Sequence, residues 1–233
     1  MITSKLRYFS LFKERLNENR RKLFRNTCFG KWLDILFYDH EPHFIDYILQ
    51  KQVFVDDGHY DMPLVYNVEG RFLHFGRPKF SLITGLHFGT FSFRKFKSGD
   101  VAFVSRVLPN KLGLKVTSLD LLGLIEDEEL FGKLDDDDAV RVCLLLALEV
   151  IFIKKKLVDE VPDTLMRLVE NLEVWNDFRW GEYIWRHLYD QIMNVVSKKK
   201  WEHLEGLSKS RNYVPTYTLS GFVWSFKVSK ISF

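Results

Sequence analysis

The residues that could act as nucleophiles are two cysteines, and their surroundings argue against catalysis. Cys143 lies within the apolar run 142–146, where burial raises a thiol pKa and hides the thiolate. Cys28 has basic neighbours that would lower its pKa, but no histidine lies near it in the sequence. The motifs of serine hydrolases and of glycine-rich nucleotide-binding loops do not occur in the 233 residues. We therefore expect two structural cysteines and no catalytic residues.

His40 and His43 form the nearest approach to a metal-binding motif. Imidazoles together with carboxylates are the usual ligands of catalytic zinc. Pro42 interrupts this pair, and its spacing is not the i, i+4 spacing that places two histidines on one helix face. The four consecutive carboxylates of Asp135–Asp138 lack the alternating ligands and the turn glycine of a calcium loop. We expect no metal and no cofactor.

Two basic stretches that also contain phenylalanine are candidates for binding. Residues 1–31 contain nine Lys and Arg side chains against two Glu, and residues 91–97 combine Phe with Lys and Arg. Basic side chains neutralise phosphates, and aromatic rings stack on bases. The alternatives are a solvated helix face for the first stretch and a loop with buried phenylalanines for the second. The candidate nucleic-acid contacts are Arg20, Arg21, Lys22, Arg25 and Lys97, and the candidate protein contacts in the second stretch are Arg94 and Lys95.

Three tryptophans recur every five residues, at Trp175, Trp180 and Trp185. A spacing of five does not keep side chains on one helix face, so these rings do not form a simple core stripe. An exposed Trp180 together with Arg186 would make a hot spot for a protein partner. The alternative is aromatic packing where two helices join.

Acidic residues concentrate in the middle of the chain. Residues 120–138 contain nine carboxylates and one lysine, so this segment and the basic residues 1–31 are suited to attract each other or to bind separate partners. Within it, Asp135–Asp138 precede an apolar run that ends at Lys154–Lys156. Acidic residues at the start of a helix and basic residues at its end complement the helix dipole.

The elements that must position these residues are mostly helices. Apolar spacing predicts helices over residues 4–20, 78–86, 139–156 and 181–200, and two β-rich runs around Gly70 predict a hairpin. Residues 90–118 are irregular and predict a mobile or partner-binding loop. We expect an α+β fold, a predominantly α-helical single domain with a small β-hairpin, and a core that includes Leu144, Leu148, Ile184 and Leu188.

Three stretches resemble a known family. They are Phe80–Gly89, Trp175–Asp190 and Tyr217–Lys227. The chain resembles a plant domain-of-unknown-function family that is found in transposon-derived proteins, often N-terminal to a Ulp-type cysteine protease domain. The likeness covers residues 30–227. It implies a basic amphipathic helical segment at 1–29 and a divergent, truncated tail at 228–233.

The resemblance implies a noncatalytic interaction module of a plant mobile-element-derived protein. The His, Asp and Cys set of the associated protease is missing from this chain, so we do not expect an enzyme. The expected partner is an unknown protein, and the alternative function is a nucleic-acid-binding domain that contacts DNA or RNA.

The location that we expect is the nucleus, and otherwise the cytoplasm. The N-terminal residues contain no apolar signal segment, so we expect no secretion. The longest apolar run, 142–153, is shorter than the roughly 20 residues that span a bilayer, so we expect no membrane association.

Overall fold

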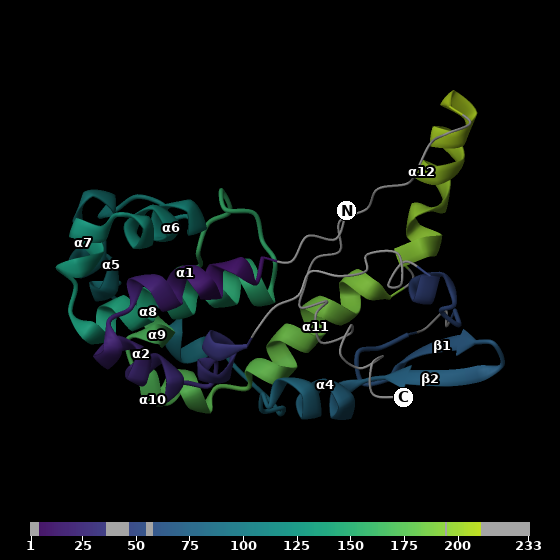
Figure 1. The fold of residues 1–233 in the computed structure, drawn as a ribbon, viewed down its shortest axis with the longest axis horizontal. Coiled ribbons are helices and arrows are strands. Elements are labelled where there is room, and N and C mark those ends of the chain that lie inside the picture. The colour runs from purple at the N-terminus through teal and green to yellow at the C-terminus, as the bar shows by residue number, and fades with distance from the viewer. Residues whose placement is uncertain (1–4, 36–46, 55–57, 194, 211–233) are drawn as a thin grey trace. The chain divides into compact units, whose positions relative to one another are not determined.

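The computed structural model describes residues 5–35, 47–54, 58–193 and 195–210 (Figure 1). Most of them lie in helices, and the sheet has two antiparallel strands. The predicted α+β fold with mainly helical content is confirmed. The chain divides into two compact units. Unit 1 contains Tyr38–Phe88 and Trp180–Phe233 with Met1–Ser4, and unit 2 contains Lys5–Phe37 and Gly89–Arg179.

Unit 2 begins with two helices where the sequence predicts one. Helix α1 spans Arg7–Arg15, and α2 spans Glu18–Arg25. Asn17 separates them, because its side chain accepts a hydrogen bond from the backbone N–H of Arg20 and so caps the start of α2. The helix pair then presents phenylalanines on one side, and all of them are buried.

The rest of unit 2 consists of short helices that follow one another closely. They are η1 (Gly30–Asp34), η2 (Arg94–Phe96), α5 (Ala102–Val107), η3 (Pro109–Lys111), α6 (Ser118–Glu126), α7 (Glu128–Gly132), α8 (Asp136–Leu146), the π-helix η4 (Ala147–Phe152), α9 (Asp163–Val169) and α10 (Leu172–Asp177). Phe152 lies at the centre of an aromatic cluster, with ring centroids 4.5 Å from Phe29, 5.9 Å from Trp32 and 6.2 Å from Phe9. This cluster joins the start of the unit to its long central helix.

The central helix of unit 2 consists of α8 and η4. It begins three residues before the predicted helix 139–156 and ends four residues before that helix does. Asp136–Asp138 form its first turn, as their charge favours. Its last turns widen into η4, and Lys154 then takes a positive φ of 64°. Lys155 does not extend the helix but pairs with the carboxylate of Glu149, at 2.5 Å. Burial raises the pKa of Glu149, and the nearby Lys155 opposes that rise.

Unit 1 contains the hairpin, a helical turn at residues 47–50 and three longer helices in its described part. Strands β1 (Leu64–Val68) and β2 (Arg71–Phe75) form the predicted hairpin, and their register places Val68 opposite Arg71. The two turn residues, Glu69 and Gly70, both have positive φ, as a tight two-residue hairpin turn requires.

The three longer helices of unit 1 are α4 (Arg77–Thr84), α11 (Trp180–Ile192) and α12 (Val195–Lys209). Helix α4 ends at Thr84, two residues before the end of the predicted helix 78–86, because Gly85, with φ 63°, supplies the left-handed conformation that closes a helix. The predicted helix 181–200 is divided between α11 and α12.

All four predicted core leucines and isoleucines are fully buried. Leu144 and Leu148 lie in the central helix of unit 2, and Ile184 and Leu188 lie on α11. None of the helices in the described ranges combines the length and the apolar character that crossing a membrane requires.

Replacing Leu148 by alanine should lower the free energy of unfolding by roughly 2–5 kcal/mol, because it leaves a cavity in a closely packed core. Urea unfolding followed by circular dichroism measures this change. Leu82 lies on α4 and is 85% exposed, so Leu82→Ala is the control and should shift the free energy by less than about 0.5 kcal/mol. Equal effects of the two substitutions would contradict the burial of Leu148.

Candidate interaction surface

Arg20 is the most deeply buried of the predicted nucleic-acid contacts, with 5% of its surface exposed. Its guanidinium pairs with Asp136 at 2.7 Å. It also donates to the carbonyl oxygens of Phe131, at 3.1 Å, and of Gly132 and Leu134. These carbonyls lie at the end of α7, where a helix leaves acceptors without intrahelical partners. The prediction that Arg20 contacts phosphates does not agree with this burial, because the side chain joins α2 to α7 and α8.

The neighbouring cations are largely paired within the same segment. Arg25 donates to both carboxylate oxygens of Asp34, at 2.8 and 3.2 Å, and Lys13 pairs with the same carboxylate at 3.1 Å. Hydrogen bonds from Arg25 and Lys13 lower the pKa of Asp34 to about 2. Arg21 donates to the carbonyl of Lys13. Of the four predicted cations in α2, Lys22 is the one that is exposed without an ion pair within the described part of the chain.

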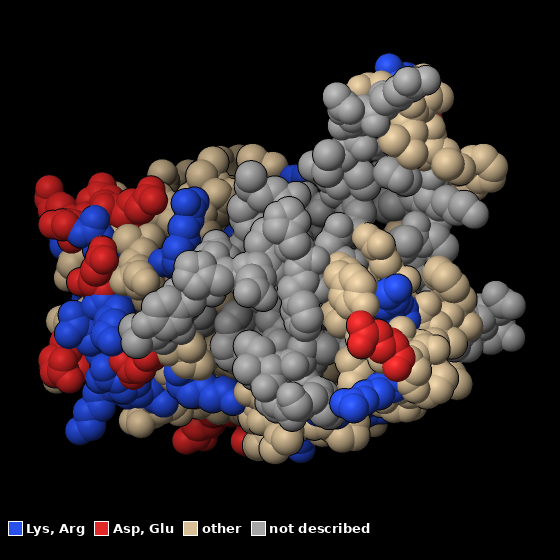
Figure 2. Space-filling model, turned by 45° about the vertical axis from the view of Figure 1, so that its right-hand side comes forward, with Lys and Arg blue, Asp and Glu red and all other residues tan. Residues whose placement is uncertain are grey.

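Carboxylates of the acidic segment 120–138 also form ion pairs with cations of the same unit. Asp138 is buried and accepts hydrogen bonds from Arg106 and Arg141, each with a shortest distance of 2.7 Å. Burial would raise the pKa of Asp138, but the two arginines hold it below its usual value. Arg106 also reaches Glu170, at 2.7 Å. Figure 2 shows the result on one face of the molecule, where basic and acidic side chains are interleaved over its left part.

A second basic segment, the basic loop of residues 91–99, is fixed by an arginine from α9. Arg167 donates to the carbonyl oxygens of Phe96, Lys97 and Gly99, at 3.0, 3.4 and 2.7 Å. It is itself held by Asp163, at 3.2 Å. The loop predicted to be mobile therefore has three backbone hydrogen bonds to one helix.

Phenylalanine rings hold the other side of the basic loop. The ring centroids of Phe91 and Phe93 lie 5.6 and 4.9 Å from that of Phe178. This packing agrees with the alternative of a loop whose phenylalanines are partly buried. Arg94, Lys95 and Lys97 point outward, are exposed, and have no ion pair among the described residues. The structure thus brings these three predicted contacts together.

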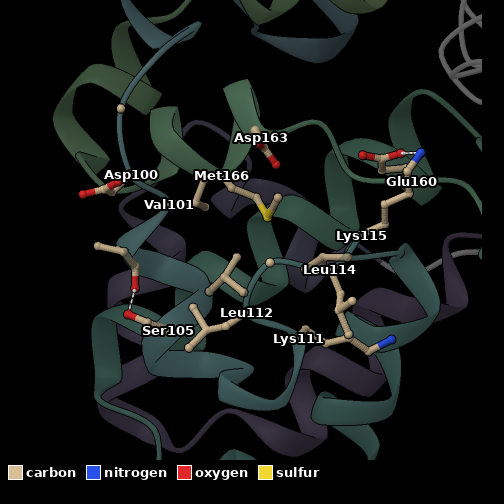
Figure 3. A pocket seen from close by; sticks show the side chains of 15 residues that line it. Asp100, Val101, Ser105, Lys111, Leu112, Leu114, Lys115, Glu160, Asp163 and Met166 are labelled. Atoms are coloured by element: carbon tan, nitrogen blue, oxygen red, sulfur yellow. Dashed lines mark hydrogen bonds and ion pairs between the residues drawn. The ribbon is translucent and has the colours of Figure 1, made fainter.

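A groove of about 660 Å³ begins where the basic loop ends. Gly99 and Asp100 form one edge, and the apolar lining comes from α5, from the segment after η3 and from α9. Figure 3 shows Val101, Met166 and Leu112 around the hollow and the Lys115–Glu160 ion pair at one side. The apolar residues that line this leucine groove are Val101, Ala102, Val104, Leu112, Leu114, Val116 and Met166.

Two leucines of the groove are unusually exposed. Leu112 is 57% and Leu114 is 65% exposed. Gly113 between them has a φ of 72°, a left-handed conformation that glycine adopts without strain. The sequence reasoning missed this groove. The available signal was a pair of leucines flanking a glycine in a segment that lacks helical or strand periodicity.

The charged residues of the groove mostly neutralise one another. Lys111 pairs with Asp120 at 2.8 Å, and Lys115 pairs with Glu160 at 2.6 Å. Asp163 faces Arg167, and Asp100 is exposed without an ion pair in the described ranges. Among the charged residues that line the groove, Asp100 is thus the one carboxylate without an ion pair in the described ranges, and the three cations of the basic loop precede Gly99, the first residue of the lining, along the chain.

The predicted hot spot at Trp180 and Arg186 has a different environment. Trp180 is fully buried, which agrees with the alternative of aromatic packing and leaves no ring surface for a partner. Arg186 pairs with the buried Glu182 at 2.8 Å, and its guanidinium carbon lies 4.0 Å from the ring centroid of Tyr60. Arg77 pairs with the same carboxylate. Arg186 thus takes part in a charge network within unit 1.

Neither of the two cysteines, both in the described ranges, has the environment of a reactive thiol. Burial raises the pKa of the Cys28 thiol to about 12 and that of Cys143 further. In the described ranges no three His, Cys, Asp or Glu side chains form a group that could hold a metal ion. His40 and His43 lie outside the described residues, as does the stretch 217–227.

The comparison with protein families gives one match, to the family described as "Domain of unknown function (DUF1985)", over residues 49–191. This match covers more than half of the chain. The chain belongs to the DUF1985 family. No curated protein and no solved structure shows a significant match.

Only one of the two basic stretches lies within the DUF1985 match. It includes the basic loop and the leucine groove, whereas α1 and α2 precede it. It also contains two of the stretches that carried the resemblance, and these meet in the structure. The backbone N–H of Gly181 donates to the carbonyl oxygen of His87 at 2.9 Å, and a side chain at Gly181 would approach that oxygen to 2.7 Å. These stretches therefore have a structural role in unit 1.

Replacing Arg20 by alanine should lower the free energy of unfolding by more than about 2 kcal/mol, because buried acceptors left without a donor are penalised by about 1–3 kcal/mol each. Arg25→Ala is the matched control, since it removes an exposed ion pair and should lower the free energy of unfolding far less than Arg20→Ala does. Urea unfolding of both variants measures the difference. A small effect of Arg20→Ala would contradict the structural role of this side chain.

Both thiols should react slowly in the folded protein, because burial raises their pKa and lowers the thiolate fraction. Reaction with a chromogenic disulfide at pH 8 should be roughly 100-fold slower than for free cysteine, and two thiols should react quickly after unfolding in urea. A cysteine that reacts in the folded protein as fast as free cysteine would show that it is activated.

Proposed function

We propose that this DUF1985 protein is a noncatalytic protein-interaction module, and that it contacts its partner through the basic loop and the leucine groove. The observation that carries the proposal is the position of Arg94, Lys95 and Lys97. They are exposed, have no ion pair in the described part of the chain, and lie on a segment that leads directly into an apolar groove. Both features fall within the DUF1985 match.

The proposed setting is a plant mobile-element-derived protein of the nucleus, in which this domain is normally associated with a Ulp-type protease domain. The three stretches that resemble such proteins support this setting, and the family match supports a domain of unknown function. Both cysteines have raised thiol pKa values. A buried, protonated thiol is a poor nucleophile, which supports a noncatalytic role for the chain.

The geometry gives less support to nucleic-acid binding. Arg20 is buried, and Arg25 is paired with Asp34, so the basic N-terminal segment offers few cations to phosphates. The rings of Phe91 and Phe93 contact Phe178, whereas base stacking needs an open aromatic face. Binding of nucleic acid by the remaining cations is an outcome that the following experiment detects.

The full chain should bind peptides in a way that depends on the basic loop. Panning against a display library of random peptides should enrich sequences whose binding is lost when Arg94, Lys95 and Lys97 are changed to alanine. The matched control changes Arg7, Lys22 and Arg71, which are also exposed, and removes the same charge elsewhere. It should retain binding.

Labelled duplex and single-stranded DNA are tested in parallel at low and physiological salt. Phosphate contacts weaken steeply as salt rises, so we expect no binding at physiological salt. Loop-dependent DNA binding at physiological salt would replace the proposed function by nucleic-acid binding. A library that yields no loop-dependent peptide would also overturn the proposal.

A further inference from the structure

The leucine groove and the basic loop together define the chemistry of a partner. We propose that the groove binds a linear peptide segment with apolar anchor residues flanked by Asp or Glu. This inference rests on the proposed function and deepens it, since it states which segment of a partner protein is recognised. Four features of unit 2 carry it.

The first feature is the apolar floor. Leu112 and Leu114 are each more than half exposed, although removing a leucine side chain from water is favourable. They lie beside Val101, Val104 and Met166 in one hollow (Figure 3). The volume of the groove, about 660 Å³, is large enough for several apolar side chains. The groove is open to solvent where Leu112 and Leu114 are exposed. An extended or helical peptide can enter such a groove side-on.

The second feature is the distribution of charge. Lys111, Lys115 and Asp163 are paired with neighbouring side chains and contribute little net field. The charges without an ion pair in the described ranges are the cations of the basic loop, the last of which lies two residues before Gly99 at the edge of the groove, and the carboxylate of Asp100. A peptide whose flanks carry several carboxylates would therefore gain attraction at that end of the groove.

The third feature distinguishes a peptide from a nucleic acid. Three carboxylates, those of Asp100, Glu160 and Asp163, line the groove itself. Glu160 and Asp163 are paired with Lys115 and Arg167, so Asp100 is the carboxylate that would repel a phosphate backbone laid along the groove. A peptide can place apolar residues there and keep its acidic residues over the basic loop. The mixed lining thus favours an occupant with separate apolar and acidic parts.

The fourth feature is preorganisation. Arg167 binds three carbonyls of the basic loop, and its neighbour Met166 on the same helix lines the groove. Helix α9 therefore holds the backbone of the basic loop and also contributes to the apolar floor of the groove. Because these parts are already ordered, less conformational entropy is lost when a partner binds. Met166 adds a flexible, polarisable side chain that adapts to differently shaped anchors.

The test uses the full chain and two display libraries with the same randomised apolar centre. The flanks are Asp and Glu in one library and Asn and Gln in the other. The acidic library should be enriched preferentially, and a fluorescent copy of its strongest peptide should bind roughly tenfold or more weakly when its acidic flanks are made neutral. Equal enrichment of the two libraries would overturn the acidic part of the proposal.

Groove variants locate the binding site. The double variant Leu112→Asp and Leu114→Asp should weaken binding of the selected peptide by roughly tenfold or more. Leu82→Asp is the matched control, because Leu82 is an exposed leucine on α4 of unit 1, and it should leave binding unchanged. An unchanged urea midpoint in all variants shows that they fold.

The outcomes separate the inference from the proposed function. Peptides that depend on the basic loop but not on Leu112 and Leu114 would leave the interaction module standing and overturn the groove as its binding site. If the wild-type chain sediments as a dimer, the groove variant is monomeric, and neither library yields a peptide whose binding depends on Leu112 and Leu114, a second copy of the chain is the occupant and the inference is overturned.

Discussion

The burial of Arg20 is the interaction on which unit 2 depends. Its guanidinium lies between the carbonyl end of α7 and Asp136 at the start of α8, so a single side chain satisfies carbonyl acceptors that the end of α7 leaves open and pairs with the carboxylate of Asp136. The aromatic cluster around Phe152 packs the same N-terminal helices on the continuation of α8. One polar contact and one apolar cluster thus hold the basic N-terminal segment on the acidic middle of the chain.

This arrangement decides which charges are available to a partner. The attraction between the basic and acidic segments is used within the unit, by Arg20 with Asp136 and by the pairing of Asp138 with Arg106 and Arg141. The strongest positive stretch of the sequence is therefore not the surface that we propose for binding. The basic loop has fewer cations, but Arg167 holds its backbone while its own charged side chains remain exposed. Charge counted along a sequence has to be corrected for the partners that folding supplies.

Local signals were enough to predict the hairpin, the buried leucines of α8 and α11 and the helical content, because each depends on residues within a few positions of one another. The burial of Arg20 and of Trp180 could not be predicted from such local signals. Arg20 meets Asp136 across 116 positions, and sequence spacing contains no information about that contact. The leucine groove is built from three separate segments, around residues 99–105, 111–116 and 160–166, and no single segment has a distinctive pattern. The helix breaks at Asn17 and Gly85 were visible as capping residues, but the apolar spacing across Asn17 favoured a continuous helix.

The most direct test of this account is the reactivity of individual arginines in the folded chain. Phenylglyoxal modifies accessible guanidinium groups, and peptide mass spectrometry measures the rate at each position. Arg94 should be modified at the rate of a free arginine, and Arg20 should be protected until the chain is unfolded in urea. Equal rates at Arg20 and Arg94 in the folded protein would contradict the claim that folding buries the cation of the N-terminal segment and leaves the basic loop available to a partner.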